Sequence, residues 1–316
     1  MDHSIKTKQI TKKKSKKSIR YYWPFLVMCI PGLAYLLINN FLPLAGLTIA
    51  FRDIDYSIGI FNSPWAGFKN FEFLFATDSA WIIFRNTVAY NAIFIVVNTV
   101  AAVTVAILLN EVRKKVMLRI YQSLVLLPYL ISMVVVAYIV YAALAADTGF
   151  VNQSILKPLG IKPINWYIEP QYWPIILPLV NLWKQVGFLC VIYFASIIGI
   201  SSDYFEAAIL DGAGKWKQII HITLPLIRPT IITMFLLAVG RIFYADFGLF
   251  YQVPMDSGMI YSTTNVIDTY VYRALIKIGD IGMASAAGFF QSVLGFILVM
   301  STNLLVRRVD SENALF

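Results

Sequence analysis

Apolar residues fall into six long runs along this chain, separated by shorter polar stretches. A helix needs about 20 apolar residues to cross the hydrocarbon core of a bilayer, and several of these runs are longer, so tilted or extended spans are expected. Trp23, Trp81 and Trp173 each open a run, at a place where an indole ring prefers the lipid headgroups. The pattern predicts membrane-spanning helices at residues 23–51, 81–109, 120–146, 173–200, 224–250 and 281–306.

Composition supports lipid as the solvent of these helices. The chain has 316 residues, of which 59% are hydrophobic and only 14% are charged, and its mean hydropathy is +0.70. Soluble domains usually carry about a quarter charged residues. We therefore predict an all-α polytopic membrane protein with a basic tail at 1–21, one transmembrane domain at 22–308 and a short tail at 309–316. No second soluble domain fits this length.

The net charge of +9 is concentrated at the N-terminus, directly before the first apolar run. A tail of this kind anchors a chain at anionic headgroups on the cytoplasmic side, and we expect no nucleic-acid partner. The basic residues of the tail are Lys6, Lys8, Lys12, Lys13, Lys14, Lys16, Lys17 and Arg20.

The remaining cations orient the spans. If the N-terminus is inside, clusters of Lys and Arg near 113–119, 215–228 and 307–308 also fall inside, while cations on the other side are sparse. Cytoplasmic loops carry such an excess, so both termini are predicted to be cytoplasmic. The outer connections at 52–80, 147–172 and about 251–280 are long.

The inner loop at about 201–225 differs from the other connections. It contains a short stretch of small residues flanked by two carboxylates, then a glycine-rich break and an amphipathic segment that ends at Pro225. Small residues allow another surface to approach closely, and glycine allows a turn. A plain membrane-surface connector is the alternative interpretation. The residues that carry the pattern are Glu206, Ala207, Ala208, Asp211, Gly212 and Ala213.

This pattern, followed by the Ile-Thr-Leu-Pro ending at 222–225, resembles the EAA loop of ABC importer permeases, in the carbohydrate or maltose-importer branch. Stretches at 65–71, 85–87 and 263–273 are similar to oligosaccharide and polysaccharide permeases of the LplB type. The resemblance covers residues 22–308. It implies the type I importer fold and the transport of a carbohydrate across the bacterial cytoplasmic membrane.

The resemblance also implies partners. These are a second permease subunit that completes the translocation path, two cytoplasmic ATPase subunits that dock on the EAA loops, and an extracellular substrate-binding lipoprotein. The sequence itself has no G-x-x-x-x-G-K-[ST] phosphate loop. We therefore expect no cofactor on this chain, and ATP with Mg²⁺ on the ATPase subunits.

Polar residues inside the predicted spans are candidates for the substrate path, because ionisable groups there tend to face a cavity or a partner. The candidates are Asn181, Lys184, Tyr244 and Asp246. Lys184 could instead pair with Asp246 or extend toward the headgroups. Asn91, Asn98 and Gln291 could equally form helix–helix hydrogen bonds.

Other functions are less well supported by the residues. An ABC permease for phosphate or amino acids would not be expected to show the Thr-Leu-Pro ending. A membrane-embedded glycosyltransferase would need an acidic motif, for which Asp53 and Asp55 are the only candidates, and neither His3 nor His221 has a catalytic partner. A secondary transporter would be expected to have more spans and an internal repeat. The chain is therefore predicted to be a transporter subunit and not an enzyme.

Overall fold

A computed structural model describes residues 19–60, 62–72 and 78–309. Within these ranges the regular structure is helical, apart from one isolated β-bridge between Arg52 and Trp65. The all-α fold class is thus confirmed, whereas residues 1–18 of the basic tail and 310–316 of the C-terminal tail lie outside the described residues. The described residues divide between residues 48 and 49 into two compact units.

The first unit holds the first apolar run. Its helix α1 (Ile19–Leu36) contains Pro24 and Pro31, and it continues through the π-helical turn η1 (Leu37–Phe41) into the 3₁₀ helix η2 (Leu42–Phe51). The segment Tyr22–Phe51 is long and apolar enough to cross a membrane. Its large apolar side chains are exposed within the unit, as expected for a helix whose solvent is lipid.

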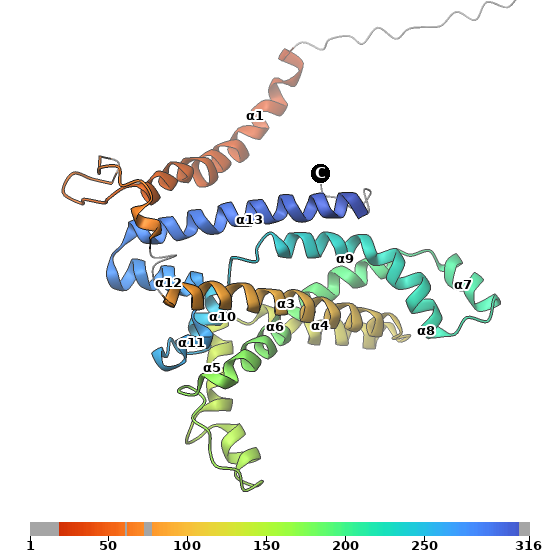
Figure 1. Cartoon of the computed structure of the whole chain (residues 1–316). Coiled ribbons are helices and arrows are strands. Elements are labelled where there is room, and N and C mark those ends of the chain that lie inside the picture. The colour runs from red at the N-terminus through yellow and green to blue at the C-terminus, as the bar shows by residue number, and fades with distance from the viewer. Residues whose placement is uncertain (1–18, 61, 73–77, 310–316) are drawn as a thin grey trace, which may run out of the picture. The chain divides into compact units, whose positions relative to one another are not determined.

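The second unit is a bundle built around two long helices, α3 (Asp78–Asn110) and α6 (Trp173–Ile198). They pack along each other, and the small residues Ala102 and Ala106 join Tyr193 of α6 in one buried cluster. The last helix, α13 (Ile281–Val309), packs against α9 (Leu224–Val239). These four helices form the long rods of the bundle in Figure 1.

The expected third span, 120–146, corresponds to two helices joined at a sharp bend. The structure divides it into α4 (Lys115–Leu130) and α5 (Met133–Leu144), which meet at an angle of 94°. Pro128 lies in the last turn of α4, where a missing N–H weakens the helix, and Ser132 caps the start of α5. The described chain thus has five helices able to span a membrane, or six if this bent pair is one span.

The expected fifth span, 224–250, also has different limits. A continuous helix begins earlier, at α8 (Lys215–Gln218), and passes through the π-helical turn η6 (Ile219–Thr223) into α9. The wider π turn precedes Pro225, so the helix accommodates a residue that has no backbone N–H to donate in a hydrogen bond. At the other end α9 stops at Val239, and α10 (Phe247–Gln252) starts only after an irregular segment at 240–246.

The connections carry short helices. In the loop before α13, Asp256 accepts hydrogen bonds from Arg273 and Lys277, at 2.8 and 2.9 Å. Burial raises the pKa of Asp256, but hydrogen bonds from Lys277, Tyr261 and Arg273 outweigh it and lower the pKa. These contacts tie the loop into one structure. The other short helices are η3 (Lys69–Phe71), η4 (Val151–Leu156), η5 (Pro170–Tyr172), α7 (Ser202–Leu210), η7 (Gly258–Ile260), α11 (Tyr261–Thr264), α12 (Ile267–Arg273) and η8 (Ala274–Ile278).

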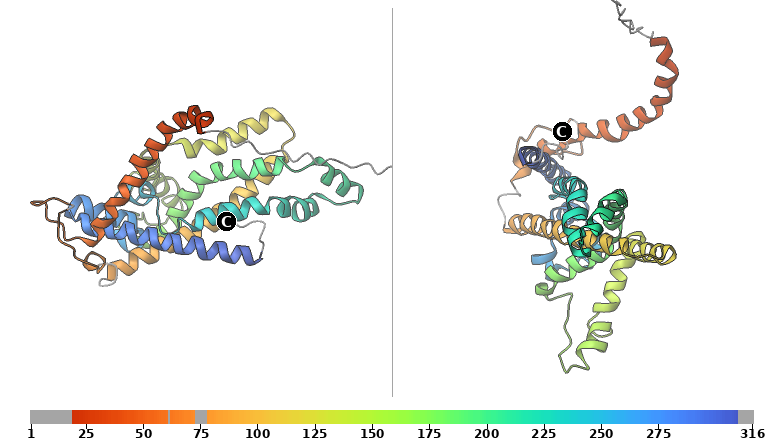
Figure 2. Two further views of the ribbon diagram at one scale, coloured as in Figure 1. Left: turned by 90° about the horizontal axis from the view of Figure 1, so that it is seen from above. Right: turned by 90° about the vertical axis from the view of Figure 1, so that its right-hand side faces the viewer.

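Two of these elements, α7 and α8, lie together at one end of the bundle (Figure 1, Figure 2). The short helices α10, α11 and α12 lie at the opposite end. The bundle therefore separates the loop at 201–225 from the irregular segment at 240–246 along its length.

Candidate functional site

The irregular segment at 240–246 interrupts a long apolar run, so its backbone groups need partners from elsewhere in the fold. In a bilayer such backbone persists only where protein or a cavity satisfies it. Asn91 on α3 donates to the carbonyls of Ile242 and Tyr244, at 2.9 and 3.2 Å. One amide side chain from a distant helix thus holds two of the freed carbonyls.

Two further side chains complete the support of this segment. Gln291 on α13 donates to the carbonyl of Phe243 at 2.7 Å, and the carboxylate of Asp268 on α12 accepts from the backbone N–H of Ala245 at 2.7 Å. Burial raises the pKa of Asp268, although its hydrogen bonds lower it in part. The segment is therefore irregular but fixed by side chains from three helices.

A close helix crossing sets the start of the segment. A Cβ atom added to Gly240 would lie 2.6 Å from Cγ2 of Val299, and one added to Gly295 would lie 3.0 Å from the carbonyl oxygen of Gly240. A side chain at either position would therefore force α13 or the end of α9 to shift. The crossing holds the chain where it leaves the helix.

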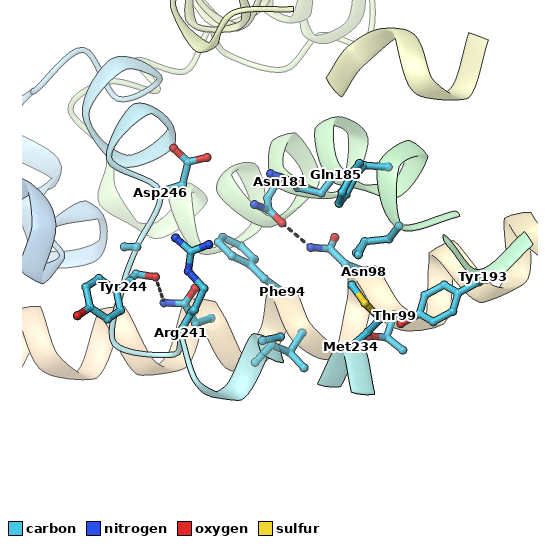
Figure 3. Close-up of a pocket in the computed structure, with 16 residues that line it drawn as sticks. Phe94, Asn98, Thr99, Asn181, Gln185, Tyr193, Met234, Arg241, Tyr244 and Asp246 are labelled. Atoms are coloured by element: carbon cyan, nitrogen blue, oxygen red, sulfur yellow. Dashed lines mark hydrogen bonds between the residues drawn. The ribbon is translucent and has the colours of Figure 1, made fainter. Parts of the chain in front are cut away.

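A cavity of about 460 Å³ opens beside this segment, between α3, α6 and the end of α9 (Figure 3). Its walls combine amide groups, aromatic rings and two ionisable side chains, Arg241 and Asp246. Binding sites for small molecules have this character, with apolar walls and a few placed polar groups. The amide side chains are those of Asn91, Asn98, Asn181 and Gln185, and the aromatic ones are those of Phe94, Phe188, Tyr193 and Tyr244.

Two buried asparagines form the centre of the cavity wall. Nδ2 of Asn98 on α3 donates to Oδ1 of Asn181 on α6 at 2.7 Å, and both residues are less than a tenth exposed. Oδ1 of Asn98 has no hydrogen-bond partner within the described part of the chain. The pair therefore links the two helices and still leaves one acceptor for a ligand.

Three of the four residues expected on the substrate path come together here: Asn181, Tyr244 and Asp246 all line the cavity. Tyr244 also shares a hydrogen bond with Ser292 at 2.8 Å. Oδ1 of Asp246 accepts from the N–H of Leu249 at 3.1 Å and so caps α10. Asp246 thus has a structural role beside its position in the wall.

Lys184, the fourth candidate, does not line this cavity. Its side chain is buried, and Nζ donates to the carbonyls of Pro128, Tyr129 and Ile131, at the broken end of α4. Asp246 is not its partner, and the ammonium does not extend to solvent. A cation at a helix C-terminus satisfies the unpaired carbonyls and complements the helix dipole.

Several lining residues were not among the expected path residues. Asn98 forms the expected helix–helix hydrogen bond, with Asn181, whereas Asn91 bonds to the irregular segment; both residues also line the cavity. Arg241 and Gln185 are the main omissions. A signal for Arg241 was its charge within an apolar run, but Tyr193 and Phe188 carry no local signal that separates them from other aromatic residues.

The loop at 201–225 forms a second candidate site. Helix α7 starts at a Ser201 cap, and the chain then turns at Gly212, where φ is +74°, before Gly214 caps α8. The expected turn at Gly212 is therefore present. Of the six residues of the pattern, Glu206, Ala207, Asp211 and Gly212 are exposed, and Ala208 and Ala213 are half-buried.

Contacts with the end of α3 hold this loop in place. Nζ of Lys215 lies 2.9 Å from Oε2 of Glu111, and Phe205 and Ile209 line a cleft of about 150 Å³ beside that pair. The buried Gln218 donates to the carbonyl of Ala213 at 2.9 Å. These contacts join one side of the loop to the end of α3.

The other side of the loop carries exposed apolar residues. Leu210 is 88% exposed and Trp216 is 77% exposed, while Tyr204 is also exposed. Leu210 and Trp216 lie at the end of α7 and the start of α8, on either side of the Gly212 turn. Large apolar side chains that flank a fixed turn are typical of a protein–protein contact.

Residues 98–311 match a family described as the binding-protein-dependent transport system inner membrane component. Protein LplB of Bacillus subtilis is 33% identical over 290 residues, which cover 92% of this chain and 90% of LplB. The polygalacturonan/rhamnogalacturonan transport system permease protein YteP of the same organism is 31% identical over 312 residues, which cover 99% of this chain and 96% of YteP.

A solved structure agrees with these relatives. A chain in the crystal structure of a bacterial ABC transporter involved in the import of the acidic polysaccharide alginate superposes with a TM-score of 0.84 at 30% identity, covering 92% of this chain and 98% of that chain. These similarities confirm the ABC importer permease fold, a multi-pass inner-membrane location and a transport role in place of an enzymatic one. The chain belongs to the family of inner-membrane components of binding-protein-dependent transport systems.

Proposed function

We propose that this chain and a second permease subunit form the translocation path of an ATP-driven importer for an oligosaccharide. An extracellular binding protein delivers the sugar to the outer face. The observation that carries the proposal is the 460 Å³ cavity with its amide and aromatic walls. Two relatives support the substrate class, because one is named for polygalacturonan transport and another was solved with an alginate pentasaccharide-bound periplasmic protein.

The chemistry of the cavity suits a sugar. Hydroxyl groups both donate and accept, and an amide side chain offers one group of each kind. Asn98, Asn181 and Gln185 supply such groups, while Phe94 and Phe188 offer apolar faces to the carbon side of a sugar ring. Asn181, Tyr244 and Asp246 keep their proposed place on the path, whereas Lys184 is proposed to support the wall from behind.

The loop from Glu206 to Trp216 is proposed as the docking element for one of two ATPase subunits. Its exposed apolar residues flank the fixed turn at Gly212, and Glu206 adds a charge whose interaction strengthens once the interface excludes water. ATP and Mg²⁺ are proposed to bind the ATPase subunits and not this chain. This arrangement requires the loop to be cytoplasmic, which agrees with the prediction from the Lys and Arg distribution that both termini are inside.

Reconstitution tests this function. We expect the chain, co-expressed with the second permease and the ATPase subunits of its transport system and supplied with the cognate binding protein, to accumulate an oligosaccharide in vesicles only when ATP is present. The purified chain alone should hydrolyse no ATP. Accumulation of phosphate or an amino acid in place of a sugar would contradict the carbohydrate assignment. ATPase activity of the isolated chain would contradict the proposal that the separate ATPase subunits hydrolyse ATP.

A further inference from the structure

The cavity contains one cation that no group of the described residues neutralises. Arg241 lines it and is exposed, and its guanidinium has no hydrogen bond or ion pair within the described part of the chain (Figure 3). Charged side chains within membrane-spanning bundles are costly unless a partner or a water-filled path compensates them. The unpaired guanidinium is therefore available to an anionic ligand that enters the cavity.

The other polar groups of the wall are already engaged or neutral. Asn91 is bonded to the carbonyls of the irregular segment, and Asn181 accepts from Asn98. Asp246 is the one carboxylate of the wall, but it does not form an ion pair with Arg241 among the described residues, and one of its oxygens caps α10. The guanidinium thus remains available for a ligand.

The backbone that carries Arg241 is held firmly. Its N–H donates to the carbonyl of Ala238 at 3.0 Å, and its carbonyl accepts from the N–H of Tyr244 at 2.9 Å. The Gly240 crossing and the Asn91 bonds fix the residues on either side. The fixed backbone places the guanidinium beside the cavity, and its planar fork matches a carboxylate through two parallel hydrogen bonds.

The second unsatisfied group in the wall complements this cation. Asn98 is 8% exposed, and its Oδ1 lacks a hydrogen-bond partner within the described chain, so it can accept from a ligand hydroxyl. A ligand with both a carboxylate and hydroxyl groups would satisfy Arg241 and Asn98 together. Uronate sugars have this combination, whereas neutral sugars lack the carboxylate.

We propose that Arg241 binds a sugar carboxylate and that the transported substrate is an acidic oligosaccharide built from uronate units. This inference rests on the proposed carbohydrate function and specifies its substrate class. Arg241 is thereby a specificity-determining residue of the path, and Asn98 binds a hydroxyl of the same ligand.

The test measures binding to the assembled complex of both permeases and the ATPase subunits in lipid nanodiscs, without the binding protein. The probes are trisaccharides of galacturonate, mannuronate and guluronate, each compared by calorimetry with its carboxyl-reduced counterpart. Reduction removes the charge and keeps the sugar backbone. We expect at least one uronate probe to bind about tenfold more tightly than its reduced partner, as a charge-assisted hydrogen bond predicts.

Arg241→Gln should remove this preference, and Arg241→Lys should retain part of it. Arg119→Gln is the matched control, because Arg119 is exposed and does not line the cavity. A preference that persists in Arg241→Gln, or wild-type complex that binds charged and reduced probes equally, would overturn the role of Arg241 and leave carbohydrate transport standing. If Arg241→Gln fails to assemble, Arg241→Lys with an unchanged preference and an unchanged affinity overturns the bidentate contact.

Two further results separate this inference from its alternatives. If the wild-type complex binds neither member of any pair, the carbohydrate function fails together with the inference. If Arg241 instead forms a closing ion pair with Asp246, the exchange Arg241→Asp with Asp246→Arg should restore a uronate uptake that either single change abolishes. Such restoration would overturn the ligand-binding role, whereas our inference expects the exchanged variant to remain inactive.

Discussion

Nζ of Lys184 on α6 lies 3.2 Å from the carbonyl oxygen of Tyr129, next to the break between α4 and α5. The same ammonium also bonds to the carbonyls of Pro128 and Ile131. One turn further along α6, a Cβ atom added to Gly187 would lie 2.0 Å from the carbonyl oxygen of Val125. The two helices therefore meet closely where α4 ends, and Lys184 supplies the donors that a continuing helix would have provided.

Lys184→Met should destabilise the complex, because it removes the side-chain donor of the carbonyls of Tyr129 and Ile131 at the end of α4. We expect a loss of about 1–3 kcal/mol, from the desolvation of unsatisfied groups. The measurement is the melting temperature of the purified complex, together with sugar uptake. Lys162→Met is the control, since Lys162 is exposed. Equal melting temperatures for the two variants would show that Lys184 does not support the bend.

Gly212→Ala should impair ATPase docking through backbone strain. The φ of +74° lies in a region that side chains with a Cβ disfavour, by about 1–2 kcal/mol per residue, although no atom lies within 4 Å of an added Cβ. Gly214→Ala adds the same methyl group to open space at an ordinary φ. We expect weaker ATPase co-purification only for Gly212→Ala, and a larger loss for Gly212→Val. If the Gly212 and Gly214 variants behave alike, the turn is not required.

Leu210→Ser should weaken the same interface without changing the stability of the chain. Leu210 is 88% exposed, so its removal disturbs no packing within the described residues, while a docked partner would lose a buried leucine worth about 2 kcal/mol. Co-purification of the ATPase at matched expression measures the effect. Met259→Ser is the control at the other end of the bundle. Undiminished ATPase recovery with Leu210→Ser would place the docking surface elsewhere.

The orientation of the chain can be tested with single cysteines. In a background where Cys29 and Cys190 are replaced, an impermeant maleimide applied to whole cells should modify Lys162→Cys and spare Lys217→Cys. This expectation follows from the excess of Lys and Arg on the side of the loop at 201–225. Permeabilised cells provide the control, because both positions are exposed and should then react. The opposite labelling pattern would invert the proposed topology.

Much of the coupling loop was predictable because it is local in sequence. Glu206 through Ala213 lie within one helix and its turn, so their spacing alone placed them on one element, and the turn at Gly212 follows from the residue type. The exposure of Leu210 and Trp216 was not apparent from the sequence. In a membrane chain, an apolar side chain can face lipid, a core or a partner, and only the packed structure separates these cases.

The cavity was predictable in part. Asn181, Tyr244 and Asp246 are polar groups in apolar runs, and they do meet in one wall. Lys184 is also a polar residue in an apolar run, but its ammonium donates hydrogen bonds to carbonyls at the end of α4. A polar residue in a span must satisfy some unpaired group, and the sequence does not show whether that group is a substrate or a broken helix.

The sequence by itself determined that the helices of this protein lie in lipid, and hence that its secondary structure is helical. Six apolar runs with few charges require lipid, and lipid requires that backbone groups be satisfied within each segment, so the chain is helical. Pro128 marks one break in the sequence, but only the tertiary structure decided that the fifth run breaks at 240–246. The irregular segment at 240–246 persists because Asn91, Gln291 and Asp268 reach it from three other helices, between 23 and 153 residues away along the chain. Hydrogen bonds over such separations depend on how the helices pack, and no local pattern encodes them.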